Sequence, residues 1–209
     1  MPKRPRVCRA GDAGVTEYTE NGGEIDTMGI EVEMSWRPES NPNWFIGAQL
    51  SLMDNEFGDY NIAKIYGIGD LGGRQDLGDP DSPSLSLTGF RPAMSPEYTF
   101  GTQVSYDWEL GNGSILTPYA QVYLSDAYWG FDVNMPGNRQ SSYSKWDFRL
   151  IWTSPQAAWS VNAFVLNATN EEVFNRALIF NPGGSTTLAS IQTNWQNPRT
   201  WGVSVQWNF

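Results

Sequence analysis

The chain has 209 residues and carries 13 Lys and Arg residues against 23 Asp and Glu residues, and its formal net charge of −10 argues against a nucleic-acid partner. It contains no histidine, which excludes imidazole-based catalysis and histidine-bound metal, and its one cysteine, Cys8, cannot form an intrachain disulfide. No run of about eighteen apolar residues is present, so no transmembrane helix is predicted.

The first 26 residues are predicted to form an irregular tail and a polar loop. The opening, Met1–Ala10, is basic, but no apolar segment follows it, so it lacks the pattern of a signal peptide. Residues 11–26 combine several carboxylates with a turn signal at Asn21-Gly22-Gly23. The basic opening is interpreted either as a polybasic binding tail or as the point where a longer protein was cut.

From residue 27 onward, apolar and polar side chains alternate with a period of two, the pattern of β-strands with one apolar face. The predicted strands cover residues 28–36, 44–52, 98–108, 116–124, 146–153, 159–166 and 200–209. In the last strand the apolar row consists of Trp201, Val203, Val205, Trp207 and Phe209. The intervening stretches at 54–94, 125–143 and 167–199 have no steady period and are predicted to be long loops.

Two fold classes accommodate such strands: a soluble β-sandwich, which would bury the apolar rows, and an outer-membrane barrel, which would turn them to lipid. The connections alternate between short and long, as in porins. Six outward Trp residues gather near the short turns, and three aromatic residues lie at the opposite strand ends. The two rows are Trp36, Trp44, Trp108, Trp152, Trp159 and Trp207, and Tyr98, Trp146 and Trp201. Two rows of aromatic residues, one on each side of an aliphatic band, match the two interfaces of a bilayer, so the pattern favours the barrel.

The fold class predicted is therefore all-β: an antiparallel, up-and-down transmembrane barrel. Seven strands in this order leave the first and last pointing the same way, so antiparallel closure fails. The chain is predicted to be an open arc of about seven C-terminal strands of a larger barrel. Because a barrel protein must be exported, the missing signal also suggests a missing N-terminal part.

Four stretches carry a resemblance to a known family. They are Asn21–Gly23 with Gly29–Glu33, Gly89–Pro92 with Ser95–Phe100, Phe164–Asn170, and Asn197–Phe209. These stretches resemble four motifs of TonB-dependent outer-membrane receptors. The first resembles the family's Asn-Gly and Gly-Ile-Glu strand opening, and the second its Gly, Pro and Pro-x-x-Thr entry to a descending strand. The third resembles the Asn-x-Thr-Asn/Asp segment of the penultimate strand, and the fourth the Pro-Arg-Thr-aromatic-Gly start of the last strand. Two further segments, Ser144–Leu150 and Val173–Arg176, look closest to the iron-complex receptors of that family.

The resemblance implies a barrel of twenty-two strands filled by an N-terminal plug, with residues 27–209 as its C-terminal part. It implies a location in the outer membrane of Gram-negative bacteria and TonB-dependent uptake of a scarce nutrient, most commonly a ferric siderophore. The implied partners are the bilayer, TonB through an absent N-terminal part, the barrel-assembly machinery that recognises the C-terminal strand, and a small-molecule ligand. This chain has no counterpart of the plug or TonB box and is expected to be inactive alone. The alternatives are uptake of an oligosaccharide or another non-iron ligand, a passive porin, a structural or adhesive barrel, and an enzyme embedded in a barrel.

Candidate catalytic and metal-binding motifs carry little weight. Residues 67–73 match G-x-G-x-x-G, but no helix start follows, and a flexible loop is the interpretation. Three carboxylates, Asp76, Asp79 and Asp81, lack the spacing of a Ca²⁺ loop. The acidic pairs Asp107/Glu109 and Glu171/Glu172 have no nucleophile or converging group beside them. No catalytic residue, cofactor site or metal site is therefore predicted, and Asp147 and Arg149 are expected to join a charge ladder with neighbouring strands.

The candidate ligand-binding residues are loop aromatics: Tyr128, Trp129, Phe131 and Trp195. Their rings could pack against a siderophore or sugar from outside, or loop against loop, and the sequence does not separate these two interpretations. Without histidine, iron would be recognised as a complex held by its chelator.

Overall fold

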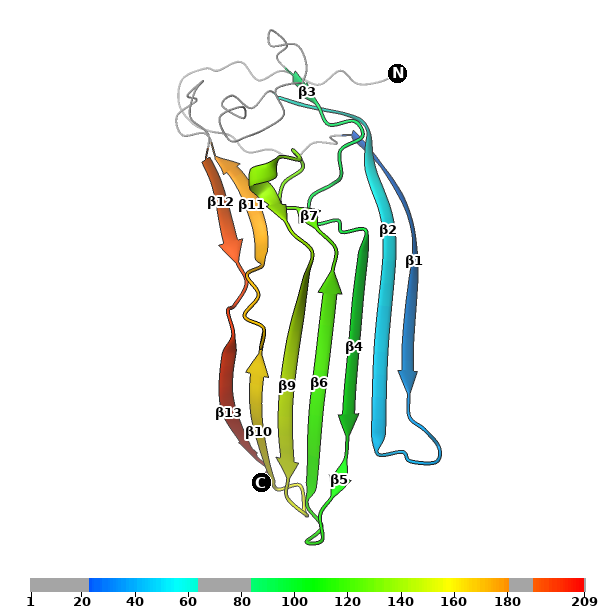
Figure 1. Ribbon diagram of the computed structural model, residues 1–209, viewed down its shortest axis with the longest axis vertical. Helices are drawn as coiled ribbons and strands as arrows, with labels where there is room; N and C mark the ends of the chain where they lie inside the picture. The colour runs from blue at the N-terminus through cyan, green and yellow to red at the C-terminus, as the bar shows by residue number, and fades with distance from the viewer. Residues whose placement is uncertain (1–22, 64–83, 181–189, 209) are drawn as a thin grey trace.

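The computed structural model describes residues 23–63, 84–180 and 190–208. Seven long antiparallel strands form one sheet in chain order, each hydrogen-bonded to the strand before it (Figure 1). They are β1 (Gly23–Trp36), β2 (Trp44–Ala63), β4 (Tyr98–Tyr106), β6 (Ile115–Ser125), β9 (Tyr143–Thr153), β10 (Trp159–Leu166) and β13 (Thr200–Trp207). The predicted up-and-down order and the seven-stranded open arc are confirmed. In the described ranges no helix is long and apolar enough to cross a membrane.

The connections alternate in length, as predicted. Short turns join β1 to β2, β4 to β6 and β9 to β10 at the lower end of Figure 1, here called the turn end. Long connections gather at the upper end, here called the loop end. Two-residue β5 (Trp108–Glu109) extends the pairing with β6 at the turn end. In the described ranges the sheet is therefore asymmetric from end to end, with short turns at one end of the strands and the longer connections at the other.

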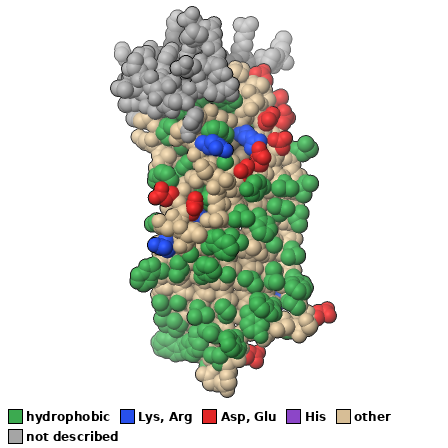
Figure 2. Space-filling model, in the orientation of Figure 1, with side chains coloured by type: hydrophobic (Ala, Val, Ile, Leu, Met, Phe, Trp, Pro, Cys, Tyr) green, Lys and Arg blue, Asp and Glu red, His purple; other side chains and the backbone are tan. Residues whose placement is uncertain are grey.

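One face of the sheet is apolar and open to the surroundings. On β1, Met28, Ile30, Val32 and Met34 are all more than half exposed, and on β13 Trp201, the most exposed, reaches 79%. Figure 2 shows hydrophobic side chains as a belt across the sheet, with the charged side chains near its margins. A water-solvated face of this size would be an aggregation site, whereas lipid is the solvent that such a belt requires. No second sheet covers the belt in the part of the chain that the structure describes, which excludes the sandwich.

Aromatic side chains mark the margins of the belt. At the turn end, Trp159 and Trp207 stack across β10 and β13 with ring centroids 5.5 Å apart and planes 8° apart. Trp108 and Trp152 both pair with Leu116, so they share one row across the sheet. A row of Trp residues at one end of the belt is typical of a membrane interface, where an amphipathic ring is most stable.

Three of the predicted boundaries are wrong. Strand β2 continues past residue 52 to Ala63 and pairs there with β3 (Ser84–Ser86), inside the stretch expected to be loop. The predicted loop at 167–199 contains a hairpin of β11 (Phe174–Phe180) and β12 (Ser190–Trp195). Strand β1 begins at Gly23, so the expected polar loop ends before Asp26. Beyond the lipid belt both strand faces can meet water, so the alternation that signals a strand is no longer required.

The buried core lies at the loop end rather than between the strands. One cluster consists of Phe57, Leu85, Leu87, Val133 and Met135. A second consists of Tyr128, Val173, Phe174 and Ala177. The chain around them forms β7 (Tyr128–Trp129), a 3-10 turn (Pro136–Asn138) and β8 (Arg139–Gln140) within the predicted loop at 125–143. The long connections therefore pack into a cap with its own hydrophobic cores.

Candidate ligand-facing surface of the wall

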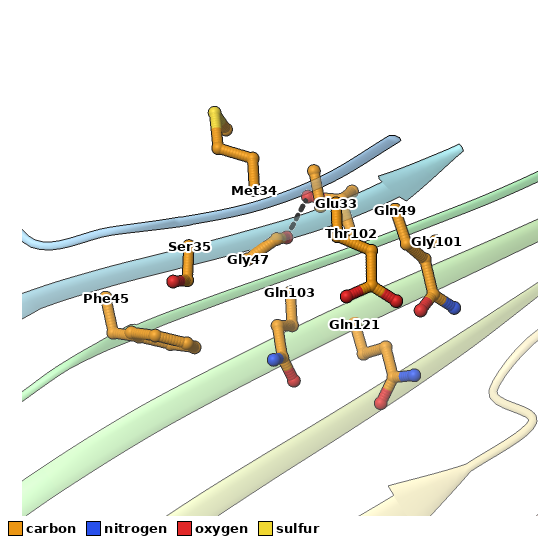
Figure 3. Close-up of a pocket in the computed structure, with 11 residues that line it drawn as sticks. Glu33, Met34, Ser35, Phe45, Gly47, Gln49, Gly101, Thr102, Gln103 and Gln121 are labelled. Atoms are coloured by element: carbon orange, nitrogen blue, oxygen red, sulfur yellow. Dashed lines mark hydrogen bonds between the residues drawn. The ribbon is translucent and has the colours of Figure 1, made fainter. Parts of the chain in front are cut away.

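The second face of the sheet is polar and carries two hollows. Figure 3 shows the first, about 440 Å³ in volume, across β1, β2, β4 and β6. Glu33, Gln49, Gln103 and Gln121 point from four neighbouring strands to the same side, away from Met34, which belongs to the apolar face. The register explains the convergence, because Glu33 lies opposite Gln49 and Gln103 lies opposite Gln121.

Large side chains on this face lie across glycines of the next strand. A Cβ atom on Gly47 would be 2.9 Å from Gln103 Nε2, and one on Gly101 would be 2.9 Å from Gln49 Nε2. The ring of Phe164 covers Gly202 in the same way, at 2.8 Å. Each of these long side chains covers the position of a glycine, which has no side chain of its own. The polar face is therefore smooth at these positions and leaves open space in front of it.

Hydrogen bonds hold the amide row in place. The Tyr119 hydroxyl lies 2.8 Å from Gln103 Oε1 and 2.8 Å from Gln121 Oε1. At the turn end the Thr117 hydroxyl donates to Asp107 Oδ1 at 2.7 Å. This part of the polar face thus presents fixed amides and hydroxyls, a surface suited to hydrogen-bonded contact.

A second hollow of about 400 Å³ lies at the loop end of the same face, and we call it the outer hollow. Every second residue along part of β6 and of β9 lines this hollow. The connections contribute three more side chains and a proline. The lining residues are Gln121, Tyr123, Ser125, Tyr143, Lys145, Asp147, Met94, Pro96, Tyr128 and Gln196. The side chains of Tyr123 and Lys145 are brought together because these residues are directly paired between β6 and β9.

Hydrogen bonds fix the charged groups of the outer hollow. The Lys145 ammonium donates to Gln196 Oε1 at 2.8 Å, which ties β9 to the connection before β13. Asp147 Oδ1 accepts the backbone N–H of Asn167 at 2.7 Å. The predicted charge ladder of Asp147 and Arg149 is wrong, because Arg149 lies opposite Tyr119 and Phe164 and Asp147 lies opposite Gln121.

The predicted ligand-binding aromatics take different positions. Tyr128 is only 4% exposed, and its hydroxyl donates to Phe174 O at 2.8 Å. Phe131 packs against the first buried cluster, and the Trp129 ring lies 5.8 Å from the Arg139 guanidinium. Trp195 is 54% exposed and packs edge-on against Phe174. Tyr128 and Phe131 are thus engaged in packing between connections, whereas Trp195 remains open to contact from outside.

Burial changes the chemistry of Tyr128. Desolvation, and secondarily the neighbouring Tyr143, raises the pKa of its phenol well above the ordinary value. The hydroxyl therefore stays neutral at physiological pH and acts as a hydrogen-bond donor that fixes the β11–β12 hairpin to the cap.

Asn167 holds the connection that leaves β10. It is 2% exposed, and its backbone φ is 49°. Its side chain donates to Glu171 O at 2.9 Å and to Asn197 O at 3.3 Å, and it accepts the N–H of Glu171 at 2.9 Å. Nearby, Asn170 Oδ1 accepts the N–H of Arg199. The Asn-x-Thr-Asn stretch thus fixes the loop end of β10 to the start of β13.

Other sequence candidates remain without a site. The G-x-G-x-x-G stretch at 67–73 and Asp76, Asp79 and Asp81 lie outside the described residues, as does Phe209. The Asp107 carboxylate accepts a hydrogen bond from the Thr117 hydroxyl, and Glu172 is exposed in the connection after β10. Within the described ranges no three acidic or cysteine side chains gather as a metal site. Tyr123, Tyr143, Lys145 and Gln196 line the outer hollow but were not predicted from the sequence as candidate ligand-binding residues. For the first three, the period of two along β6 and β9 could have placed them on the polar face.

An apolar belt outside, a polar wall inside and alternating short and long connections define an arc of a transmembrane β-barrel. Residues 6–168 match the family described as TonB dependent receptor-like, beta-barrel, and the chain belongs to this family. The predicted family is thereby confirmed. It is a family of receptors and transporters rather than enzymes. No curated protein matches the chain.

Two solved receptors share the fold. The ferric yersiniabactin uptake receptor FyuA from Yersinia pestis superposes with a TM-score of 0.65 and 21% identity over 90% of this chain. The siderophore receptor PiuA from Acinetobacter baumannii superposes with a TM-score of 0.61 and 17% identity over 88% of this chain. The chain spans 24% of the first receptor and 22% of the second, so it corresponds to about a quarter of the length of such a receptor.

Proposed function

We propose that the chain is part of the wall of an outer-membrane receptor in a Gram-negative bacterium, and that this receptor takes up a ferric siderophore with energy delivered by TonB. The observation that carries the proposal is membership of the TonB-dependent receptor family. The two structurally similar receptors, one described as a ferric yersiniabactin uptake receptor and the other as a siderophore receptor, suggest the ligand class. The plug, the TonB contact and the gating belong to the complete receptor.

The polar wall supports a receptor rather than a passive porin. Its glycine-backed amides leave a smooth polar surface, suited to a packed occupant. The cap at the loop end adds two buried clusters where an open channel would need none. Both features fit a barrel whose interior makes contacts instead of conducting freely.

Growth under iron limitation tests the proposal. The full-length gene is deleted from its host and restored on a plasmid, and growth is measured with a panel of single ferric siderophores as the iron source. The expected result is loss of growth on at least one complex upon deletion and recovery upon restoration. A matched strain without TonB should lose the same growth.

Three outcomes would contradict the proposal. Uptake that persists without TonB would indicate a passive porin. Growth defects on an oligosaccharide but on no iron complex would indicate a non-iron ligand. A normal uptake profile with altered surface adhesion would indicate a structural barrel.

A further inference from the structure

On the side of β9, β10 and β13, the apolar belt ends at two exposed tryptophans. The register places Trp201 opposite Val165 and Val165 opposite Phe148, so these three residues form one row across the outer face. Trp146 lies two residues beyond Phe148 toward the loop end, and both Trp146 and Trp201 are exposed. Their rings therefore mark the loop-end margin of the belt, where lipid acyl chains give way to headgroups.

Arg199 lies at the same margin, two residues before Trp201. The odd-numbered residues of β13 form its apolar row, so the alternation continues from Trp201 to Arg199 on the outer face. The Arg199 side chain is exposed, and its backbone N–H donates to Asn170 Oδ1 at 3.0 Å. Figure 2 shows a basic side chain at the loop-end margin of the belt, on the β13 side of the sheet.

The Arg199 guanidinium is open to a partner from outside the chain. Within the described residues no hydrogen bond or ion pair engages it, and the one ion pair lies on the connection before β4. Glu171 and Glu172 follow in the adjoining connection, but the carbonyl of Glu172 accepts a hydrogen bond from Gln140 in the cap, so the connection leads away from the belt. A guanidinium matches phosphate well, because it can donate two parallel hydrogen bonds.

The opposite end of the same margin has the reverse charge. On β1 and β2, Asp26 lies opposite Glu56, and Asp54 lies on the same side of β2 as Glu56. All three carboxylates are exposed, and the basic residue nearby, Arg91, is ion-paired with Glu97. A phosphate is therefore repelled at β1 and β2 and attracted beside β13, which localises the site.

We propose that the corner formed by Trp146, Arg199 and Trp201, here called the β13 corner, binds a phosphate-bearing lipid of the leaflet at the loop end. The Arg199 guanidinium donates to the phosphate, and the two indole rings border the acyl chains. β9 and β13 flank β10 and lie about 10 Å apart, so one lipid reaches both. The occupant is a lipid, because the corner continues the belt that lipid already solvates.

This inference goes beyond the proposed function. Ligand uptake takes place inside the barrel, whereas the β13 corner faces the membrane. The site would therefore be the same in a receptor and in a passive porin.

Native mass spectrometry of the full-length receptor in detergent tests the assignment. The probes are dioleoyl phosphatidic acid and dioleoylglycerol, which share their acyl chains and differ by the phosphate. We expect the unaltered receptor to bind phosphatidic acid more tightly than dioleoylglycerol. Arg199→Gln should weaken phosphatidic acid binding by about three- to tenfold, the usual contribution of one basic residue at an anionic lipid surface. Binding of dioleoylglycerol should not change.

The matched control is Arg139→Gln, which has the same net charge as Arg199→Gln. Arg139 lies on β8 in the cap, with its guanidinium 5.8 Å from the centre of the Trp129 ring. We expect this variant to change phosphatidic acid binding by less than about twofold, because a charge beyond the belt is screened by solvent. Arg199→Lys should bind with intermediate affinity, because it keeps the charge but loses the paired hydrogen bonds.

Three results would overturn the assignment. They are equal binding of the two lipids by the unaltered receptor, equal losses in Arg199→Gln and Arg139→Gln, and displacement of the lipid by inorganic phosphate at equal concentration, which would indicate a site for free phosphate. Each is distinct from failure of the proposed function. A receptor that binds phosphatidic acid through Arg199 but supports no iron-limited growth keeps this site without that function, and one that supports growth but shows any of the three results keeps the function without this site.

Discussion

At the scale of single residues, hydrogen-bonding side chains fix the connections outside the belt. Asn167 and Tyr128 lie in predicted loops, yet both are buried and both bond to backbone groups distant in sequence. A buried backbone carbonyl or amide without a partner is costly, so each connection needs such a side chain where the regular ladder stops. The order of these connections therefore depends on a few residues rather than on general loop composition.

Replacing Asn167 should open the connection after β10. Asn167→Ala removes three side-chain hydrogen bonds and places alanine at a φ of 49°, so we expect the local opening free energy to fall by about 2 kcal/mol or more. Asn167→Gly loses the same bonds but tolerates the backbone angle, so its effect should be smaller. Hydrogen exchange of the Glu171 amide in the full-length receptor measures both. Equal protection in the alanine variant and the unaltered protein would contradict the prediction.

Alkaline pH should release the Tyr128 contact. The pKa of Tyr128 is raised in the folded protein above the ordinary value of 10.0, so the neutral form is favoured by folding. The stabilisation is complete below pH 10 and is lost as the pH rises from there through the folded pKa. Limited proteolysis of the connection between β10 and β13 should therefore accelerate in the unaltered protein only above that pH.

Tyr128→Phe is the control for this titration. The variant lacks the hydrogen bond to Phe174 O, which contributes about 0.5–1.5 kcal/mol, so cleavage at neutral pH should be modestly faster. It cannot ionise, so its cleavage should not accelerate between pH 10 and 12 through this site. An identical alkaline acceleration in both proteins would assign the effect to other groups.

At the scale of elements, alternation along a strand decides which solvent each side chain meets. On β9, Trp146, Phe148, Leu150 and Trp152 face outward, and Lys145, Asp147 and Arg149 lie on the polar face. The aliphatic and phenyl groups in the middle of this row lie between the two interfacial Trp residues. A charge there meets hydrocarbon, whereas a charge one residue away meets the polar interior.

Leu150→Arg and Ile151→Arg should therefore differ sharply. Leu150 is 46% exposed in the middle of the belt, and an arginine there should cost about 2–4 kcal/mol of barrel stability. Ile151 lies opposite Thr117 and Asn162 on the polar face, where an arginine should cost much less. Urea unfolding of the full-length barrel in vesicles gives both values. Similar losses for the two variants would show that Leu150 does not face lipid.

At the scale of the whole molecule, the arc has two open edges. In the described part of the chain, β1 pairs only with β2, and β13 pairs only with β10. Each open edge leaves backbone N–H and C=O groups without ladder partners. In hydrocarbon each such group costs several kcal/mol, so a stable wall needs further strands at both edges.

The 209-residue chain by itself should consequently fail to form a stable barrel. We expect no folded band in vesicles when unheated and heated samples are compared by gel electrophoresis, because the open edges cannot be solvated by lipid. The full-length receptor under the same conditions should give the folded band. A heat-sensitive folded band from the chain alone would show that the two edges find partners without other strands.

How far the fold could be predicted depends on where each strand meets lipid. Within the belt, β4, β6, β9, β10 and β13 lie within a few residues of their expected bounds, because lipid on one side and polar contacts on the other impose a strict period of two. The end of β2 and the β11–β12 hairpin were missed, because strands outside the bilayer can be polar on both faces. Backbone pairing and contacts with the two buried clusters of the cap hold them, and neither requires a strict period of two along the strand.

The amino-acid sequence alone determined the membrane-facing surface: the alternation, the Trp rows and the lengths of the connections follow directly from the solvents on the two faces. Only the tertiary structure decided which polar residues meet. Lys145 and Gln196 are 51 positions apart, and their contact depends on the strand register and on how the last connection folds over the sheet. The alternation of apolar and polar residues along a strand assigns each side chain to one face of the sheet. It does not determine which residue lies opposite on the next strand, because register and loop packing depend on long-range hydrogen bonds and burial.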